Sequence, residues 1–454
     1  MPRDYLSSLA DEMLDEISTF FGHGWYGSHP PIMMHDFAFF RDLHGDTLRP
    51  SFTQHDHDPY MSYRALAQTC KSFCAHFQPR LFSHLYLPLD SHMRKVAELI
   101  QDNPVLASYI RMIGLEVDRK GISLFEYPPL LAIMQAASSS GTPPRIILYI
   151  GTGYTAIYGR SREFISDTIS HILTAPQIIL HAVTHLDIAD MPFSAGLFRL
   201  LCNLRVVWCY RFAAFSISNK SFSNRSAEDA TPNFFCPKLD ALKLYSCNPA
   251  TIKMLCEQIL DLSAVKELEV TFIEMGSNGK AYAKAKGLLA RRLLDRAQSV
   301  QKLHLDIGVM VGPFYDLSRL QHLRECTLHV EVEAGTNPAP HLCQLLRTLP
   351  PLPEHDLEYL HLSFGFIDTL LDESDIAGSH VLFSISTWSN FDAALFDVVA
   401  SGTRPFKLTL AFYIRMPDFY SVKPLLTDLF VNWGRNFLPR SSQQRNLEII
   451  ILHH

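Results

Sequence analysis

The sequence of 454 residues contains none of the short motifs that mark the common hydrolases, nucleotide-binding enzymes and zinc enzymes. There is no GxSxG elbow, no phosphate-binding P-loop and no HExxH helix. Its nine cysteines include no CxxC pair, so the spacing of a zinc or thiol redox site is missing. We therefore expect a protein that is not an enzyme, that holds no cofactor and no metal, and whose cysteines are reduced core thiols.

Positive charge and long apolar runs are also scarce. Lys and Arg total 40 against 46 Asp and Glu, which gives a formal net charge of -6 and an isoelectric point near 6.4. Nucleic-acid binding normally needs a basic field, so we expect no nucleic-acid partner. No segment approaches the roughly 20 apolar residues that span a bilayer, and acids stand where a secretory signal would begin with basic residues. We expect a soluble protein of the cytoplasm or nucleus, with no membrane partner.

The sequence does contain a recurring triplet: an apolar residue, two spacers, an apolar residue, one spacer and an apolar residue. This spacing predicts a short strand with one buried face, and its recurrence indicates a stack of similar units. The triplets are Val183/Leu186/Ile188, Leu201/Leu204/Val206, Leu239/Leu242/Leu244, Val265/Leu268/Val270, Val300/Leu303/Leu305 and Leu357/Leu360/Leu362. We expect the middle leucine of each to face the interior of one curved parallel sheet. Such a stack presents a long surface, so binding is the first functional expectation.

After residue 87, strand patterns alternate with helical patterns, as in a parallel sheet with helices outside it. We expect strands at residues 110–117, 145–150, 183–189, 203–208, 239–245, 265–272, 301–307, 323–332, 357–364, 406–413 and 446–452. Helices are expected at residues 93–102, 161–174, 250–261, 280–297 and 391–400. Two triplets continue to Cys209 and Cys247, where a leucine-rich repeat places an inward Cys or Asn. Over about residues 105–454 the chain resembles the leucine-rich-repeat family, with irregular steps between units.

The first 90 residues follow another pattern. Residues 1–21 predict an amphipathic helix, residues 22–61 lose all periodicity and hold six histidines, and helical spacing returns over residues 62–87. The segments Leu9–Ile17 and Tyr63–Phe73 resemble the first two helices of the F-box family, and Pro79–Leu85 resembles its third element. Ala10 stands where that family has proline, and Thr69 stands where it has valine.

The two resemblances together imply a fold and a function. The fold would be α/β: a small all-α F-box-like module at residues 1–90, with an irregular insert at about 22–61, and a degenerate leucine-rich-repeat solenoid at residues 91–454. The protein would be the substrate-recognition subunit of a cullin-RING (SCF-type) ubiquitin ligase. Its module would bind the ligase adaptor, and its repeats would bind a target protein whose identity the sequence does not give. The implied adaptor-binding residues are Leu9, Met13, Leu14, Ile17, Leu66, Cys70 and Phe73.

Other interpretations stay open. A protein of the same fold can be an interaction scaffold outside any ligase, and the first helix can be a simple cap on the first repeat. The Gly151–Ala156 segment follows a strand pattern and imitates a dinucleotide-binding loop, which would make the chain a nucleotide-dependent enzyme. A fingerprint needs an acidic residue about 20 positions on, at the end of a second strand, and none stands there. The residues His55 and His57 have metal-ligand types, but their alternate spacing in a loop favours a solvated segment.

Overall fold

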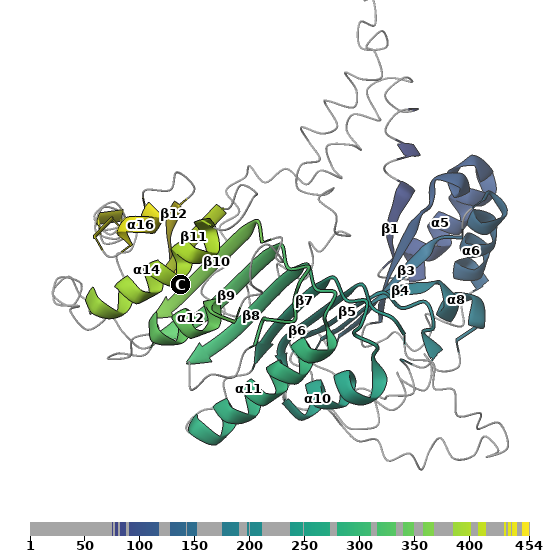
Figure 1. Ribbon diagram of the computed structural model, residues 1–454. Coiled ribbons are helices and arrows are strands. Elements are labelled where there is room, and N and C mark those ends of the chain that lie inside the picture. The colour runs from purple at the N-terminus through teal and green to yellow at the C-terminus, as the bar shows by residue number, and fades with distance from the viewer. Residues whose placement is uncertain are drawn as a thin grey trace, which may run out of the picture. The chain divides into compact units, whose positions relative to one another are not determined.

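The computed structural model describes residues 82–87, 90–117, 128–141, 143–151, 175–189, 200–210, 237–247, 249–272, 279–309, 316–332, 339–348, 357–366, 385–400, 407–414, 438–442 and 447–453, with isolated positions elsewhere. Within these residues, a 12-stranded parallel sheet has its strands in the order of the chain (Figure 1). Parallel neighbours need a crossover connection, and helices form part of several of them.

The elements begin and end as follows. The strands are β1 (His84–Leu87), β2 (Met112–Val117), β3 (Arg145–Gly151), β4 (Val183–Ala189), β5 (Val206–Tyr210), β6 (Ala241–Cys247), β7 (Glu267–Phe272), β8 (Lys302–Val309), β9 (Glu325–Val332), β10 (Tyr359–Phe366), β11 (Lys407–Ile414) and β12 (Leu447–His453). The helices are α5 (Asp90–Asp102), α6 (Pro128–Ser139), α8 (Gln177–Ala182), α10 (Pro249–Met254), α11 (Gly279–Arg296), α12 (Ala339–Leu346), α14 (Ile385–Ala400) and α16 (Pro439–Ser442). A 3-10 helix covers Pro104–Tyr109, and a π-helical turn covers Leu255–Ile259.

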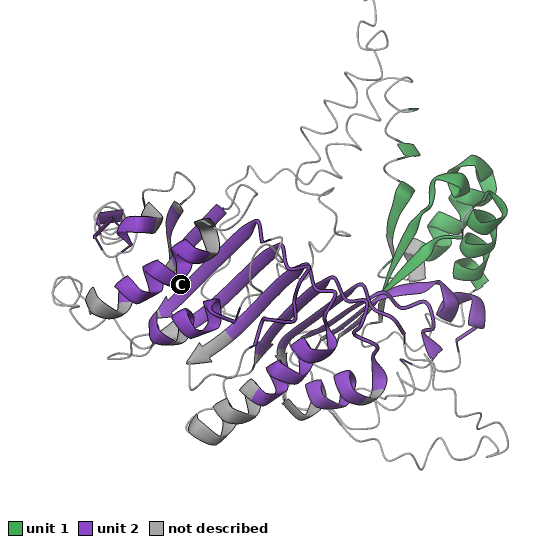
Figure 2. Ribbon diagram, in the orientation of Figure 1, with its two compact units in different colours: residues 1–116, 126–147 green, residues 117–125, 148–454 purple. Residues whose placement is uncertain are grey.

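The chain divides into two compact units (Figure 2). Unit 1 comprises residues 1–116 and 126–147, and unit 2 comprises residues 117–125 and 148–454. In unit 1, α5 and α6 pack against each other and against the 3-10 helix. Their buried side chains include Met93, Ile100, Leu130 and Ile133. Unit 2 contains β4 to β12 and all the described helices from α8 onward.

The core of unit 2 is built from apolar residues that share one face of the sheet. One row of register partners runs across β4 to β12 as Leu186, Val207, Leu242, Leu268, Leu303, Cys326, Leu360, Leu408 and Leu447. A second row, two residues further along each strand, runs as Ile188, Cys209, Leu244, Val270, Leu305, Leu328, Leu362, Leu410 and Ile449. From β4 to β11 both rows are buried. We call them the apolar rows.

Helices cover the face that bears the apolar rows. Phe364 of β10 packs edge-on against Trp388 of α14, with 6.2 Å between the ring centroids, and Trp388 in turn meets Phe391 at 5.3 Å. Helix α11 consists largely of Ala, Leu, Lys and Arg, which are strong helix formers, and it buries Leu289 and Leu293. Figure 1 shows α10, α11, α12 and α14 along this side of the sheet. The opposite face of unit 2 therefore carries the remaining strand side chains.

The expected α/β class is confirmed, and so is each strand predicted beyond residue 105. Helices lie at four of the five predicted places, and the fifth, at 161–174, lies outside the described residues. The prediction of helix through residue 87 was wrong, because residues 84–87 form β1, which pairs with β2. Helices α6, α8, α12 and α16 were not predicted. The predicted domain boundary near residue 90 stays a prediction.

The middle leucines of the triplets are all buried, but one triplet was placed out of register. In β5 the inward residues are Val207 and Cys209, whereas Leu204 lies before the strand and Val206 is on the other face. Cys209 therefore occupies a core position inside its strand and is not equivalent to Cys247. Only Cys247 behaves as expected, because it is buried and its thiol donates to the backbone carbonyls of Cys209 and Tyr245, each at 3.4 Å.

Candidate functional site

The face of unit 2 opposite the apolar rows carries polar side chains in register, and we call it the polar face. Successive strand residues point to opposite faces, so the residue between two core positions lies here. One row of register partners crosses all nine strands from β4 to β12: Asp187, Trp208, Lys243, Glu269, His304, Thr327, His361, Thr409 and Glu448. We call it the central polar row. Neighbouring strands lie about 4.8 Å apart, so each member can interact with the next.

A second row lies two residues earlier in each strand and also carries charge. From β6 to β11 it consists of Ala241, Glu267, Lys302, Glu325, Tyr359 and Lys407. We call it the outer polar row. Opposite charges stand side by side at Lys243 and Glu269 in the central polar row and at Glu267, Lys302 and Glu325 in the outer polar row, which is the arrangement that stabilises cross-strand pairs.

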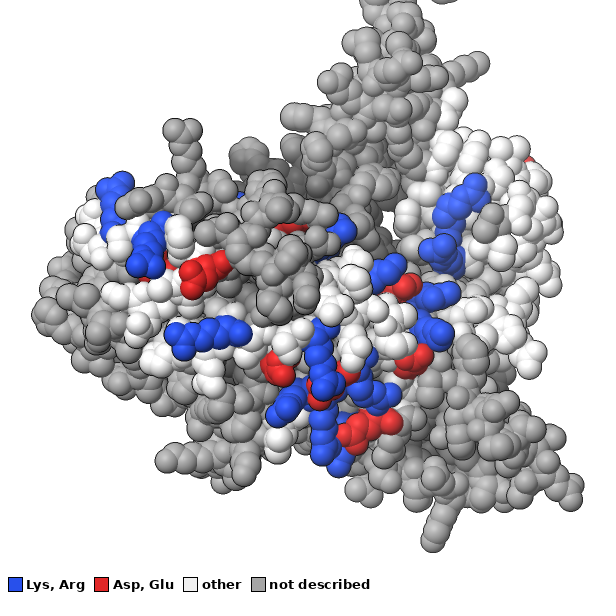
Figure 3. Space-filling model, viewed as in Figure 1, with Lys and Arg blue, Asp and Glu red and all other residues white. Residues whose placement is uncertain are grey.

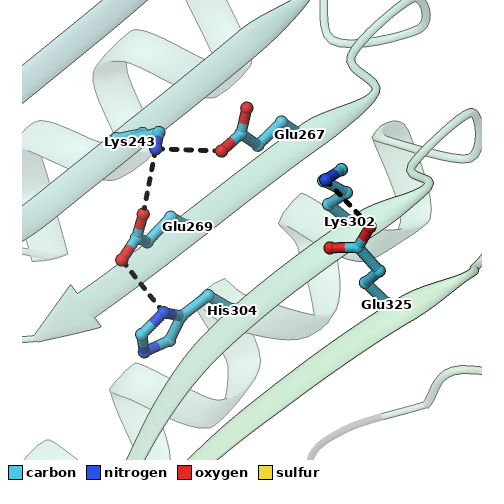
Figure 4. Close-up of polar contacts among 6 residues, drawn as sticks. All are labelled: Lys243, Glu267, Glu269, Lys302, His304 and Glu325. Atoms are coloured by element: carbon cyan, nitrogen blue, oxygen red, sulfur yellow. Dashed lines mark ion pairs between the residues drawn. The ribbon is translucent and has the colours of Figure 1, made fainter. Parts of the chain in front are cut away.

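An ion network joins β6, β7 and β8 (Figure 4). Nζ of Lys243 lies 2.9 Å from Oε1 of Glu267 and 3.5 Å from Oε2 of Glu269, and Nδ1 of His304 lies 3.0 Å from Oε1 of Glu269. The same ammonium group stands 5.1 Å from the ring centroid of Trp208, a cation–π distance. Lys243 is only 8% exposed. A charge buried to this extent needs such partners, so the network holds this end of the face in one arrangement.

Glu269 is the centre of this network and remains ionised far into acid. Burial would raise the pKa of its carboxyl, but the hydrogen bond and charge of His304, the charge of Lys243 and a hydrogen bond from Tyr245 outweigh burial. Together they lower the pKa of Glu269 from 4.5 to about 2. The charge at this position is therefore fixed throughout the physiological range of pH.

The part of the polar face on β8 to β12, which we call its open part, carries four exposed charged side chains, although Ser363 and Thr409 on the same face are buried. Lys302 pairs with Glu325 at 2.8 Å, and Lys407 pairs with Glu448 at 2.9 Å; the four side chains are 44% to 57% exposed. The hydroxyl of Thr409 donates a hydrogen bond to the carboxylate of Glu448 at 3.2 Å. The hydrogen bond from Lys407 lowers the pKa of Glu448, and the same bond raises the pKa of Lys407. These side chains are accessible to another protein.

Three histidines lie on consecutive strands in this open part. His304 is on β8, His329 is on β9 and His361 is on β10. Nδ1 of His329 lies 2.8 Å from the hydroxyl oxygen of Ser363, and Nδ1 of His361 lies 3.1 Å from that of Tyr359. Burial lowers the pKa of His361, and the neighbouring His304 lowers it further.

The ring of His329 also lies close to the backbone at position 365. A Cβ added to Gly365 would lie 3.1 Å from Cε1 and 3.2 Å from Nε2 of that ring. This spacing is tighter than ordinary van der Waals contact. With glycine at this position, the imidazole of His329 approaches the β10 backbone without shifting.

The helix-covered side of unit 2 differs from the polar face, because its positive and negative side chains are intermingled and form no row (Figure 3). Blue and red side chains are intermingled over α10 and α11 in that view. Arg292 pairs with Glu257 at 2.8 Å and Arg319 pairs with Asp295 at 3.3 Å. These pairs are exposed and contribute little to stability or to a field of one sign.

The implied adaptor-binding residues lie outside the described residues. They are Leu9, Met13, Leu14, Ile17, Leu66, Cys70 and Phe73. Most of the Gly151–Ala156 loop and the whole histidine-bearing insert at 22–61 also lie outside them, although Gly151 itself ends β3. The adaptor site, the nucleotide loop and the histidine segment therefore stay predictions.

The central polar row was not predicted, although its pattern is visible in the sequence. Each member between β6 and β11 is the spacer between two apolar positions of a strand, such as Lys243 between Leu242 and Leu244. The register between strands, which brings the spacers into one row, depends on loops of unequal length. The sequence shows each polar spacer residue, but it does not show that the spacers of neighbouring strands lie side by side.

Comparison of the chain with protein families, with curated proteins and with solved structures gives no match in any of the three. Within the described residues, no group of three or more His, Cys, Asp or Glu side chains is arranged to hold a metal ion. Among the same residues, none of the helices combines the length and the apolar character needed to cross a membrane.

Proposed function

We propose that the protein is the target-recognition subunit of a cullin-RING ubiquitin ligase and that the polar face of unit 2 holds the target protein. The observation that carries the binding role is the central polar row, which crosses nine adjacent strands without interruption. Its open part offers charged and aromatic side chains on a rigid sheet, which suits recognition of another protein surface. In this proposal the protein itself makes and breaks no covalent bond.

Two features support a degenerate leucine-rich-repeat solenoid as the frame of this surface. The order of the strands in the sheet follows the chain throughout, so each strand pairs with the strand that follows it in the sequence. From β4 to β11, each strand contributes one buried residue to each of the two apolar rows, on the face that the helices cover. A repeat architecture of this kind uses its sheet as an extended binding surface.

The ligase role is supported by the resemblance of residues 1–90 to an F-box. The proposed adaptor surface is centred on Leu9, Met13 and Ile17 of the first helix, since two short helices cannot bury all of these residues internally. The first experiment is co-purification of the full chain with the purified ligase adaptor at micromolar concentration. We expect a stable complex.

The double variant Leu9→Asp/Ile17→Asp should lose the adaptor, because an unpaired desolvated charge costs several kcal/mol at an interface. The matched control is Leu288→Asp, a change to an exposed leucine of α11, which should bind the adaptor normally. If the unchanged protein does not bind the adaptor, the ligase role is refuted, and binding by the polar face can still be measured separately.

The target-binding role is tested by cross-linking in the cell of origin. A photoreactive amino acid at position 302 or 407, on the open part of the polar face, should capture the same target protein. The same amino acid at position 292, on the helix side, is the control and should not capture it. Equal capture from all three positions would refute the polar face as the target site.

A further inference from the structure

We propose that His304, His329 and His361 form a pH sensor on the polar face, which holds a basic segment of the target near neutral pH and releases it on mild acidification. The inference rests on the proposed target-binding role of that face and adds the chemistry of the bound segment. It concerns the open part of the face, on β8 to β12. We call these three residues the imidazole cluster.

The geometry of the sheet brings the three rings together. In the central polar row, His304 and His361 are the register partners of Thr327 from its two sides. His329 lies two residues beyond Thr327 on the same strand and therefore on the same face. The three imidazoles thus surround one threonine on three adjacent strands. Side chains at directly opposite or diagonal positions of a sheet are within reach of one another's charge.

The groups facing the imidazole cluster from the neighbouring strands are mainly acidic. Among the side chains that the structure describes, β6 contributes Lys243, which pairs with both acids of β7, β7 contributes Glu267 and Glu269, β8 contributes Lys302 and Asp306, β9 contributes Glu325, β10 contributes Tyr359, β11 contributes Lys407 and β12 contributes Glu448. Carboxylates therefore outnumber ammonium groups around the rings. With neutral imidazoles this part of the face has a negative charge.

Mild acidification changes this charge through the imidazoles, because histidine is the side chain whose ordinary pKa lies closest to neutral pH. An unperturbed histidine titrates near 6.5, and His361 titrates lower because burial and the charge of His304 disfavour its protonated form. Glu269 cannot take up the proton in this range, since its pKa is about 2, and the pKa of Glu448 is also lowered. Protonation of the three imidazoles would therefore add up to three positive charges beside Glu269 and Glu448, whose lowered pKa values keep them ionised.

The sign of the charge decides the chemistry of the partner. At neutral pH the surplus carboxylates attract Lys and Arg side chains, and Glu325 and Glu448 are exposed enough to be reached. Nucleic acid and acidic segments are repelled in the same state. After protonation the surplus is cancelled, so a basic segment loses its attraction and leaves.

Oligolysine is the probe for the test, since the target is not identified. We would titrate a labelled octalysine peptide into the full chain by fluorescence anisotropy at pH 7.5 and pH 5.5, at low ionic strength, with octaglutamate as the peptide control. We expect octalysine to bind about tenfold more weakly at pH 5.5, since each added charge changes the affinity a few-fold. Octaglutamate should not bind at pH 7.5. Tighter binding of octaglutamate than of octalysine at both pH values would overturn the proposal.

Histidine variants identify the residues that cause the pH dependence of octalysine binding. The triple variant His304→Gln/His329→Gln/His361→Gln should bind octalysine with nearly the same affinity at both pH values. The control variant His322→Gln changes an exposed histidine in the turn before β9 and should keep the full pH dependence. If the triple variant keeps the full pH dependence, another group is the sensor and the proposal is overturned.

A measurement on the unchanged protein covers the case in which the triple variant does not fold. The pKa of each imidazole can be followed by NMR of its ring C–H protons, with and without octalysine. By linkage, a peptide that binds the neutral state must lower the pKa of the cluster. If the imidazole pKa values are the same in the free protein and in the protein saturated with octalysine, the proposal is overturned. If cross-linking at positions 302 and 407 captures a target equally at pH 7.5 and pH 5.5, the target site stands and only the sensor is refuted.

Discussion

Nδ1 of His304 lies 3.0 Å from a carboxylate oxygen of Glu269, so one buried acid on β7 links the imidazole of β8 to the ammonium group of Lys243 on β6. This carboxylate accepts from both neighbouring strands, which explains why its pKa is lowered despite burial. The relationship stabilises the folded state, because the unfolded chain cannot hold these partners together.

We predict a loss of stability in acid that is due to Glu269. The ordinary pKa of 4.5 applies to the unfolded chain and a pKa of about 2 applies to the folded protein. As pH falls, the unfolded state takes up the proton first, so stability present above pH 4.5 is lost between about pH 4.5 and pH 2. The loss is on the order of 3 kcal/mol. Urea unfolding measured across this range gives the slope.

The variant Glu269→Gln should lack this component and should be less stable than the unchanged protein at pH 7. The matched control is Glu325→Gln, which removes an exposed pair and should keep the slope of the unchanged protein. Identical slopes for the unchanged protein and Glu269→Gln would show that the network contributes nothing.

A second prediction concerns the apolar rows. Leu242 is fully buried in β6, so Leu242→Ala should lower the free energy of unfolding by about 2 to 5 kcal/mol. Leu288 of α11 is 47% exposed, and Leu288→Ala should change the same quantity by less than about 0.5 kcal/mol. Both values come from chemical denaturation. Similar losses in the two variants would contradict the assignment of Leu242 to the core.

The apolar triplets of the sequence predicted only part of the fold. The triplet around Leu242 predicted its strand and its burial, because three apolar residues at that spacing fit one face of a half-buried strand. The triplet ending at Val206 was placed out of register, since Leu204, Val207 and Cys209 fit the same pattern three residues later. Apolar spacing alone cannot choose between two overlapping frames.

The polar face was harder to predict for a different reason. Glu269 and His304 are 35 positions apart in the chain, and their contact depends on the register of β7 on β8. Backbone hydrogen bonds between β7 and β8 set that register, and the two strands are separated in the sequence by helix α11. The sequence supplied the residue types of the site, while long-range pairing supplied the site itself.

A third prediction concerns the reactivity of the thiols. Burial raises the pKa of Cys326 to about 12 and raises the pKa of Cys209 well above its usual range. Because the thiolate is the reactive form, these cysteines should be nearly inert to iodoacetamide in the folded protein. Cys202 is partly exposed and should be alkylated faster. Peptide mapping by mass spectrometry after timed alkylation gives the order, and faster labelling of Cys326 than of Cys202 would contradict it.

The last prediction separates net charge from the position of charge on the polar face. Lys407 and Glu448 are exposed partners on β11 and β12, so exchanging them in Lys407→Glu/Glu448→Lys keeps both the pair and the net charge. Thermal stability should change little, because exposed pairs contribute little. Glu448→Lys alone adds positive charge and should weaken octalysine binding at pH 7.5, whereas Lys407→Glu alone should strengthen it. The exchanged variant should bind as the unchanged protein does, since the surplus of carboxylates around the imidazole cluster is restored. A weak exchanged variant would instead show that a bound cation needs the carboxylate at position 448 itself.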